Sequence, residues 1–175
     1  MRYFELFAIP VDYNIDLETI NKHYLELQRA VHPDRHASSS SRDKLLAVQS
    51  AAEINDALQT LKHPVKRAEY MLSELGVDIR AEQQTLQDPL FLMQQMELRE
   101  ELEELENAAD PDAAIAQFEA QIKQLDKQYS SELAAQLASS DEQQWQAAAD
   151  NIRKLKFVYK LREELERIED SLFDD

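Results

Sequence analysis

The tripeptide His32-Pro33-Asp34 follows a stretch of sequence that has the period of an α-helix. Before it, apolar residues recur at steps of three and four, the spacing of one buried helical face: Leu17, Ile20, Tyr24, Leu27 and Val31. Lys22 and Arg29 fall on the opposite, solvated face. Because a residue that precedes proline avoids the helical conformation, the helix should stop at His32. The sequence therefore predicts an exposed corner that carries an imidazole, a proline ring and a carboxylate beside a basic helical face.

A second amphipathic helix is expected at about residues 42–62, after a serine-rich loop in which Ser41 can cap it. Its apolar stripe consists of Leu45, Val48, Ala51, Ile54, Leu58 and Leu61. A Pro-Asp turn can end any helix without a functional reason. Two antiparallel helices joined by a loop of about ten residues that bears His-Pro-Asp, however, resemble the J-domain of DnaJ-type co-chaperones.

The composition favours helices throughout the chain. The 175 residues are 43% hydrophobic and include one glycine and five prolines, and no alternating run of β-formers with hairpin signals is present. The predicted fold class is therefore all-α. A third helix should begin at Pro64 and end near Leu75, with Gly76 at a left-handed cap.

The charge is strongly acidic and unevenly distributed. Residues 1–76 hold 9 Lys or Arg and 11 Asp or Glu, whereas residues 77–175 hold 10 and 24, for a net charge of −16 over the chain. Such a charge argues against a nucleic-acid partner. The asymmetry suggests two modules with different partners.

Several kinds of site are not expected. The chain has no cysteine, so thiolate metal sites are excluded, and we expect no cofactor and no bound metal. Nowhere do about 18 apolar residues occur in succession, so we expect no membrane span. A soluble intracellular protein is the default expectation.

The second half predicts an antiparallel three-helix bundle. Asp88-Pro89 should begin a helix that runs to about Ala108, and Asp110-Pro111 should begin the next. That helix has a continuous apolar stripe: Ile115, Phe118, Ile122, Leu125, Tyr129, Leu133 and Leu137. A last helix is expected at about 142–172. The predicted domains are residues 1–76 and 89–175, with a connector at 77–88 that could seal an interdomain contact.

The helix at 89–108 has more apolar residues than its core face needs. Phe91, Leu98, Leu102 and Leu105 fall within about 60° of one another, which is wide enough for the core. Leu92, Met96 and Met93 lie roughly 100°, 140° and 200° from Phe91 and should point away from it. An apolar patch that acidic residues surround is typical of a partner-binding face, and Met suits adaptable packing. Alternatively, the patch packs against the first domain or under the connector.

Further motifs sharpen the resemblance to one family. These are Tyr3-Phe4-Glu5-Leu6-Phe7, Leu27-Gln28-Arg29 before His32-Pro33-Asp34, Ile54-Asn55-Asp56-Ala57, His63-Pro64-Val65-Lys66-Arg67-Ala68-Glu69-Tyr70, Phe91-Leu92-Met93 and Glu97-Leu98-Arg99-Glu100. Over essentially its whole length the chain resembles HscB, the J-type co-chaperone of iron–sulfur cluster assembly. The resemblance implies a J-domain that stimulates ATP hydrolysis by the DnaK-like chaperone HscA, and a C-terminal bundle that binds the cluster scaffold IscU and delivers it to the chaperone.

The resemblance also implies residue roles. His32, Pro33 and Asp34 would form the stimulatory motif, and Lys22, Arg29 and Arg35 the docking surface for the chaperone. The scaffold-binding residues would be Leu92, Met93, Met96, Glu97, Glu100, Glu104 and Phe157. By pattern alone, Phe157 fits a surface contact or the core equally well.

The sequence leaves two rival interpretations. An enzyme is disfavoured because Pro33 interrupts any helix between His32 and His36, because no histidine has the Glu-x-x-His spacing of di-iron bundles, and because one glycine cannot build a phosphate loop. His63, at a helix junction, should cap or pack instead. The other rival is a structural helical adaptor with an unknown partner, which the solvated acidic clusters support and which leaves the His-Pro-Asp corner without a role.

Overall fold

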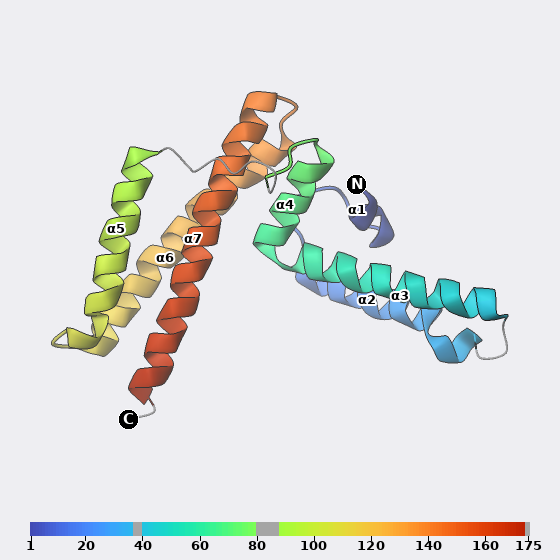
Figure 1. Ribbon diagram of the computed structural model, residues 1–175, viewed down its shortest axis with the longest axis horizontal. Coiled ribbons are helices and arrows are strands. Elements are labelled where there is room, and N and C mark those ends of the chain that lie inside the picture. Colours follow the sequence, from blue (N-terminus) through green and yellow to red (C-terminus); the bar gives the residue numbers. More distant parts are fainter. Residues whose placement is uncertain (37–39, 80–87, 174–175) are drawn as a thin grey trace. The chain divides into compact units, whose positions relative to one another are not determined.

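The computed structural model describes residues 1–36, 40–79 and 88–173 (Figure 1). Every regular element within these ranges is a helix, which confirms the predicted all-α class. The chain divides into two compact units, Met1–Asp78 and Ile79–Asp175. Residues 80–87, most of the predicted connector, lie outside the described ranges.

The first unit contains four α-helices: α1 (Arg2–Leu6), α2 (Leu17–Val31), α3 (Ser41–Lys62) and α4 (Pro64–Glu74). The Asp16 carboxylate caps α2 as predicted, accepting a hydrogen bond from the Glu18 backbone N–H at 3.0 Å. Helix α3 begins one residue earlier than predicted, because Ser40 and not Ser41 supplies its capping oxygen.

Helix α4 ends as the single glycine predicts. Gly76 adopts a φ of 95°, the left-handed region that favours glycine. Its N–H donates to the Ser73 carbonyl at 2.9 Å, and the Val77 N–H donates to the Leu72 carbonyl at 3.1 Å. These two bonds satisfy carbonyls that the helix end would otherwise leave without a donor.

The His63–Tyr70 motif closes the end of the hairpin where α1 and α4 pack. His63 Nδ1 accepts the Val65 N–H at 3.2 Å and caps α4, so its predicted capping role is confirmed. Arg67 is buried, donates to the Leu61 carbonyl at 2.7 Å and lies over the Tyr13 ring. The Tyr70 ring stacks on Tyr3 with their centroids 4.6 Å apart. The contacts of this motif therefore join α1 and α4 to the end of α3. They lie about thirty residues after the His-Pro-Asp corner in the sequence.

The other end of the hairpin is only two helices thick. In Figure 1, α2 and α3 run side by side away from α1 and α4. Ile54, Leu58 and Leu61 of the predicted stripe are buried, but Leu45 and Val48 are exposed, and so is Leu17 at the start of α2. The prediction that these three residues are buried is wrong. Helical periodicity identifies the apolar face of a helix, but it does not show how far along that face a neighbouring helix extends.

The second unit contains α5 (Pro89–Glu104), a 3₁₀ turn η2 (Leu105–Asn107), α6 (Pro111–Ala138) and α7 (Glu142–Phe173). Asp88 and Asp110 cap α5 and α6 by accepting the backbone N–H groups of Phe91 and Ala113. Helix α5 therefore ends at Glu104, before the predicted end near Ala108, because the last predicted turn is the 3₁₀ turn η2. Short connections between elements favour this antiparallel arrangement.

The core of the second unit is apolar and comes from all three helices. The largest fully buried side chains are Phe118, Ile122, Leu133, Ile152, Leu155, Val158 and Leu161. The four residues predicted to face the core, Phe91, Leu98 and Leu102 of α5 and Leu105 of η2, are all buried, which confirms the wheel prediction. Leu125 of the α6 stripe is only half-buried. Among the described helices none has the length and apolar character needed to cross a membrane.

A carboxyl pair between α6 and α7 makes stability depend on pH. A hydrogen bond with the Glu119 carboxyl, together with partial burial and the nearby Asp170 and Glu166 charges, raises the pKa of Glu169 to about 7 from its ordinary 4.5. A raised folded-state pKa contributes stability that is fully present below pH 4.5 and lost as pH rises through about 7.

Glu169→Gln should therefore raise the melting temperature at pH 8 by about 1–3 °C, with little change at pH 4.5. The rise is small because water screens much of the repulsion between the two carboxylates. Melting curves of this variant and of Glu163→Gln at both pH values check it; an equal shift at both pH values would contradict the assignment.

Candidate functional sites

The His32-Pro33-Asp34 corner is built as the sequence predicts. Helix α2 ends at Val31, and His32 leaves the helical region with φ −58° and ψ 135°. Residues Pro33–His36 then form a 3₁₀ turn, η1. The Asp34 backbone N–H donates to His32 Nδ1 at 3.2 Å, and the same nitrogen lies 3.5 Å from Asp34 Oδ2. The imidazole and the carboxylate of the corner therefore lie beside each other.

The charged groups of this corner face water. The Asp34 side chain is 93% exposed and that of His32 58%. Lys22 and Arg29 on α2, and Arg35 in η1, are also exposed. Lys22 and Arg29 are seven residues apart, so they lie on one side of α2. The corner can therefore present an anion and several cations together to a partner.

Asn55 of α3 holds α2 shortly before the corner, and sequence reasoning gave it no role. Its Oδ1 accepts hydrogen bonds from the Tyr24 hydroxyl at 2.7 Å and from Gln28 Nε2 at 2.9 Å. Tyr24 and Gln28 are four residues apart and so lie on the same helical face. The Ile54-Asn55-Asp56-Ala57 motif was the one sequence feature that pointed to Asn55. A sequence motif does not show which side chains of the neighbouring helix Asn55 contacts.

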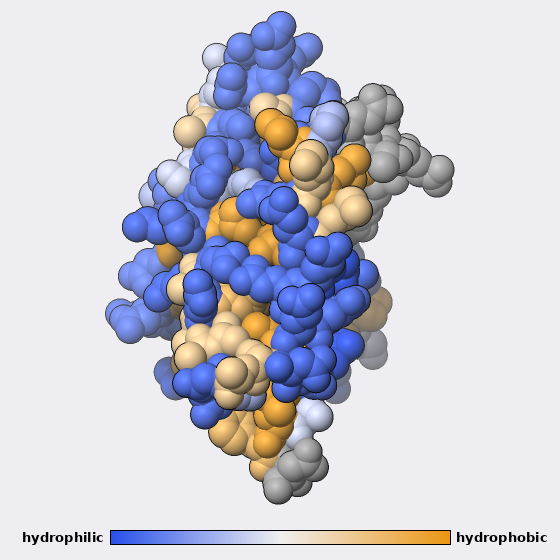
Figure 2. All heavy atoms as spheres, turned by 90° about the vertical axis from the view of Figure 1, so that its left-hand side faces the viewer, coloured by the Kyte–Doolittle hydropathy of each residue, from blue (hydrophilic) through white to orange (hydrophobic). Residues whose placement is uncertain are grey.

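The second site is the outer face of α5. Leu92, Met93 and Met96 are 45%, 58% and 65% exposed, which confirms the prediction that they point away from the core. Glu97, Glu100 and Glu104 are exposed on the same helix. Figure 2 shows the side of the molecule on which α5 lies, where apolar side chains gather between hydrophilic ones. These six residues are called the α5 face below.

Phe157 is different from the α5 face, because its side chain belongs to the core of the bundle. It is only 8% exposed. Its ring meets Phe91 edge-to-face, with centroids 5.7 Å apart and planes at 85°, and Arg99 lies over it at 5.5 Å. Arg99 in turn pairs with Glu164 at 3.2 Å. Any contact of Phe157 with a partner would have to use the small edge that these neighbours leave uncovered.

This burial gives a stability prediction. Phe157→Ala should lower the free energy of unfolding by about 3 kcal/mol, because it removes a packed ring and leaves a cavity beside Phe91. Chemical denaturation of the variant measures this loss. A loss below about 1 kcal/mol would place the ring at the surface instead.

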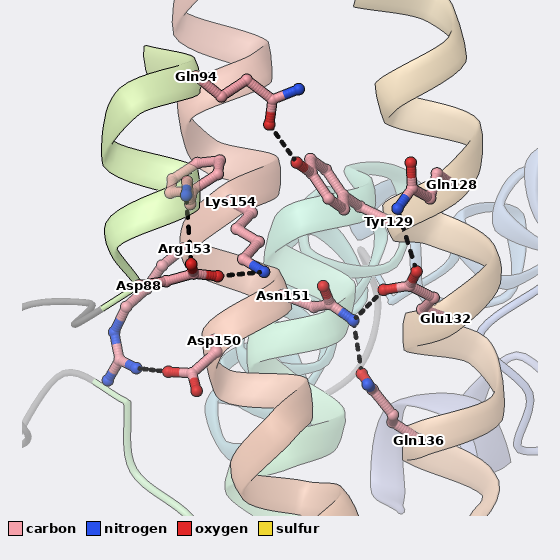
Figure 3. A network of polar contacts seen from close by, with 11 residues as sticks. Asp88, Gln94, Gln128, Tyr129, Glu132, Gln136, Asp150, Asn151, Arg153 and Lys154 are labelled. Atoms are coloured by element: carbon pink, nitrogen blue, oxygen red, sulfur yellow. Dashed lines mark hydrogen bonds and ion pairs between the residues drawn. The ribbon is translucent and has the colours of Figure 1, made fainter. Parts of the chain in front are cut away.

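The start of α5 is fixed to α7 by an ion pair. Lys154 Nζ lies 3.2 Å from Asp88 Oδ2 and over the rings of Phe91 and Tyr129, at 5.5 and 5.8 Å from their centroids (Figure 3). The hydrogen bond from the Phe91 N–H, and then Lys154, hold the pKa of the Asp88 carboxyl below its ordinary value. The cap and the ion pair together orient the first turn of α5, which carries Leu92 and Met93.

Among the described residues, neither site contains a cluster of metal ligands. Across residues 1–36, 40–79 and 88–173, no three His, Cys, Asp or Glu side chains converge in a way that could hold a metal ion. The corner and the α5 face instead offer exposed charge and exposed apolar surface, which are the chemistry of macromolecular recognition.

Comparisons with known proteins agree with both halves. The DnaJ domain family matches residues 2–70, and the family described as the HSCB C-terminal oligomerisation domain matches residues 87–166. The chain is 54% identical to a co-chaperone protein HscB homolog of Photobacterium profundum over 99% of this chain and 100% of that one, and 52% identical to that of Vibrio cholerae over 98% and 99%. Two solved structures are similar. Chaperone HscB from Vibrio cholerae has a TM-score of 0.87 at 53% identity, covering 97% of this chain and 99% of that one. Human co-chaperone HscB has a TM-score of 0.83 at 25% identity, covering 95% and 81%.

Proposed function

Since the chain belongs to the HscB family of J-domain co-chaperones, we propose that it stimulates ATP hydrolysis by a DnaK-like chaperone of the HscA type and delivers to it an iron–sulfur cluster scaffold protein of the IscU type. In this proposal residues 1–76 form the J-domain and residues 89–175 the scaffold-binding bundle. The protein regulates its partner's reaction in the cytoplasm and does not itself catalyse one.

The observation that carries the chaperone half is the exposed His32-Pro33-Asp34 corner. Its carboxylate and imidazole are free of the core, and Lys22, Arg29 and Arg35 supply exposed positive charge in the same unit. Complementary charges accelerate encounter and set the orientation of docking. These cations would meet an acidic surface on the ATPase domain of the chaperone.

The scaffold half rests on the α5 face. Three large apolar side chains are exposed on one helix, and exposed glutamates surround them. Burial of each apolar side chain in a complex contributes roughly 1.5–3 kcal/mol before ordering costs are subtracted. The glutamates would give orientation, while Phe91 and Phe157 keep the helix in place from below.

The test is the steady-state ATPase rate of an HscA-type chaperone, measured alone, with this protein, with an IscU-type scaffold and with both. The proposal expects stimulation by this protein and a further, more than additive increase when the scaffold is present. Stimulation that is indifferent to the scaffold would keep the J-domain role and reject the scaffold role. No stimulation in any mixture would leave a helical adaptor with an unknown partner.

A further inference from the structure

A groove runs between α5 and α6 beside the α5 face. It is open to solvent and has a volume of about 530 Å³. Figure 3 shows α5 and α6 on either side, with α7 between them presenting Lys154. Its lining includes Asp88, Leu90, Met93, Glu97, Glu132 and Lys154.

The rim of the groove is apolar on the α5 side. Leu90 is 79% exposed although it stands in the first turn of α5, where Asp88 and Lys154 fix the helix. Met93 belongs both to the groove and to the α5 face, so the two surfaces are continuous. A partner that covers Leu92 and Met93 would therefore also reach the groove.

The charge of the groove is negative. Among the described residues, Asp88, Glu97 and Glu132 line it against one cation, Lys154, and Asp88 already neutralises that lysine. Glu132 is held in place, because it accepts hydrogen bonds from Asn151 and Gln128, each at 3.3 Å. Glu132 and Glu97 thus supply two exposed carboxylates, from α6 and α5, over an apolar rim.

We propose that this groove receives one long basic side chain, arginine or lysine, of the scaffold protein. The aliphatic stem would lie along Leu90 and Met93, and the charged head would meet the carboxylates of Glu97 and Glu132. Long basic side chains combine an apolar stem with a charged tip in this way, and guanidinium forms strong hydrogen bonds with carboxylates. The inference rests on the scaffold-binding role proposed above and adds Leu90 and Glu132 to it.

The first experiment compares two variants that make the same chemical change. Glu132→Gln should weaken binding of a purified IscU-type scaffold by about tenfold at low salt, since it removes one charge that faces the bound cation. It keeps an acceptor oxygen for Asn151, so its melting temperature should match that of the wild type. Glu163→Gln, an exposed carboxylate of α7 outside the groove, should change the affinity by less than about twofold. The difference between the two should shrink as salt is added.

The second experiment identifies the partner side chain. Each exposed Arg or Lys of the scaffold is changed to Gln, alone and together with Glu132→Gln, and the affinities are compared as a double-mutant cycle. One position should lose its effect in the Glu132→Gln background. Leu90→Ser should weaken binding independently of salt, because it removes only apolar contact.

The outcomes separate this inference from the function on which it rests. If Leu92→Ser with Met93→Ser abolishes scaffold binding but Glu132→Gln binds as tightly as Glu163→Gln, the groove is empty in the complex and the inference is wrong. If no scaffold position couples to Glu132, it is also wrong. If the wild type does not bind the scaffold at all, both the proposed function and this inference fall.

Discussion

Asp34→Asn is expected to reduce stimulation of the chaperone ATPase by more than about tenfold while leaving the fold intact. The side chain is 93% exposed and lies 3.5 Å from the neighbouring His32, so its charge is not part of the core. Asparagine has the same shape and the same backbone, and the Asp34 N–H still donates to His32. What the substitution removes is one negative charge at the tip of the hairpin. The measurement is the ATPase rate of the HscA-type chaperone at saturating co-chaperone, with melting temperature as the check on folding.

A matched control for this prediction is Glu18→Gln. Glu18 is an exposed carboxylate in the first turn of α2, at the other end of the same helix, so the charge change is equal and only the place differs. The Glu18→Gln variant should stimulate the chaperone ATPase as strongly as the wild type does. If Asp34→Asn lost its helicity together with its activity, the corner would be a structural element, and the stimulatory role would have no support.

Leu92→Ser with Met93→Ser is expected to weaken scaffold binding by about 100-fold, and to leave stimulation measured without scaffold unchanged. Two apolar side chains that become buried contribute about 1.5 kcal/mol each at the lower bound, and each 1.4 kcal/mol is tenfold in affinity. Both side chains are about half exposed before binding, so serine there removes little from the core. Calorimetric titration of the scaffold measures the loss, and the scaffold-free ATPase rate measures what is retained.

The chain offers a control with the same chemistry for this pair too. Leu45 and Leu46 of α3 are neighbours in sequence, with 58% and 50% exposure, and they lie in the other unit. Leu45→Ser with Leu46→Ser should bind the scaffold with wild-type affinity. If the Leu92→Ser, Met93→Ser variant unfolds, these side chains support the core and do not form a binding face. Sedimentation of the wild type would show whether a second copy of the chain covers the α5 face in place of the scaffold.

Local rules predicted most of the architecture. Asp16, Asp88 and Gly76 end or begin their helices where the sequence indicates, because a cap depends on a few residues that are adjacent in the chain. The direction of Leu92 and Met93 was also predictable, since the angle between residues of one helix follows from its period. The His-Pro-Asp corner followed from the conformational restriction that proline imposes.

The features that the sequence did not predict depend on neighbours that are distant in the chain. Leu45 and Val48 share a stripe with buried residues, but α1 and α4 do not extend far enough along the hairpin to cover them. Phe157 fits the core and the surface equally by pattern, and only the positions of Phe91 and Arg99 decide its burial. The groove could not be predicted either, because Glu132 and Leu90 meet there from two helices.

The two hydrogen bonds that converge on Asn55 have a mechanical consequence. One amide oxygen anchors two successive turns of α2, so α2 cannot slide along α3 by a turn without losing both bonds together. His32 lies only four residues beyond Gln28, or about 6 Å along the helix axis. Asn55 therefore helps to fix the end of α2 that precedes the corner, and with it the position of His32 relative to α3.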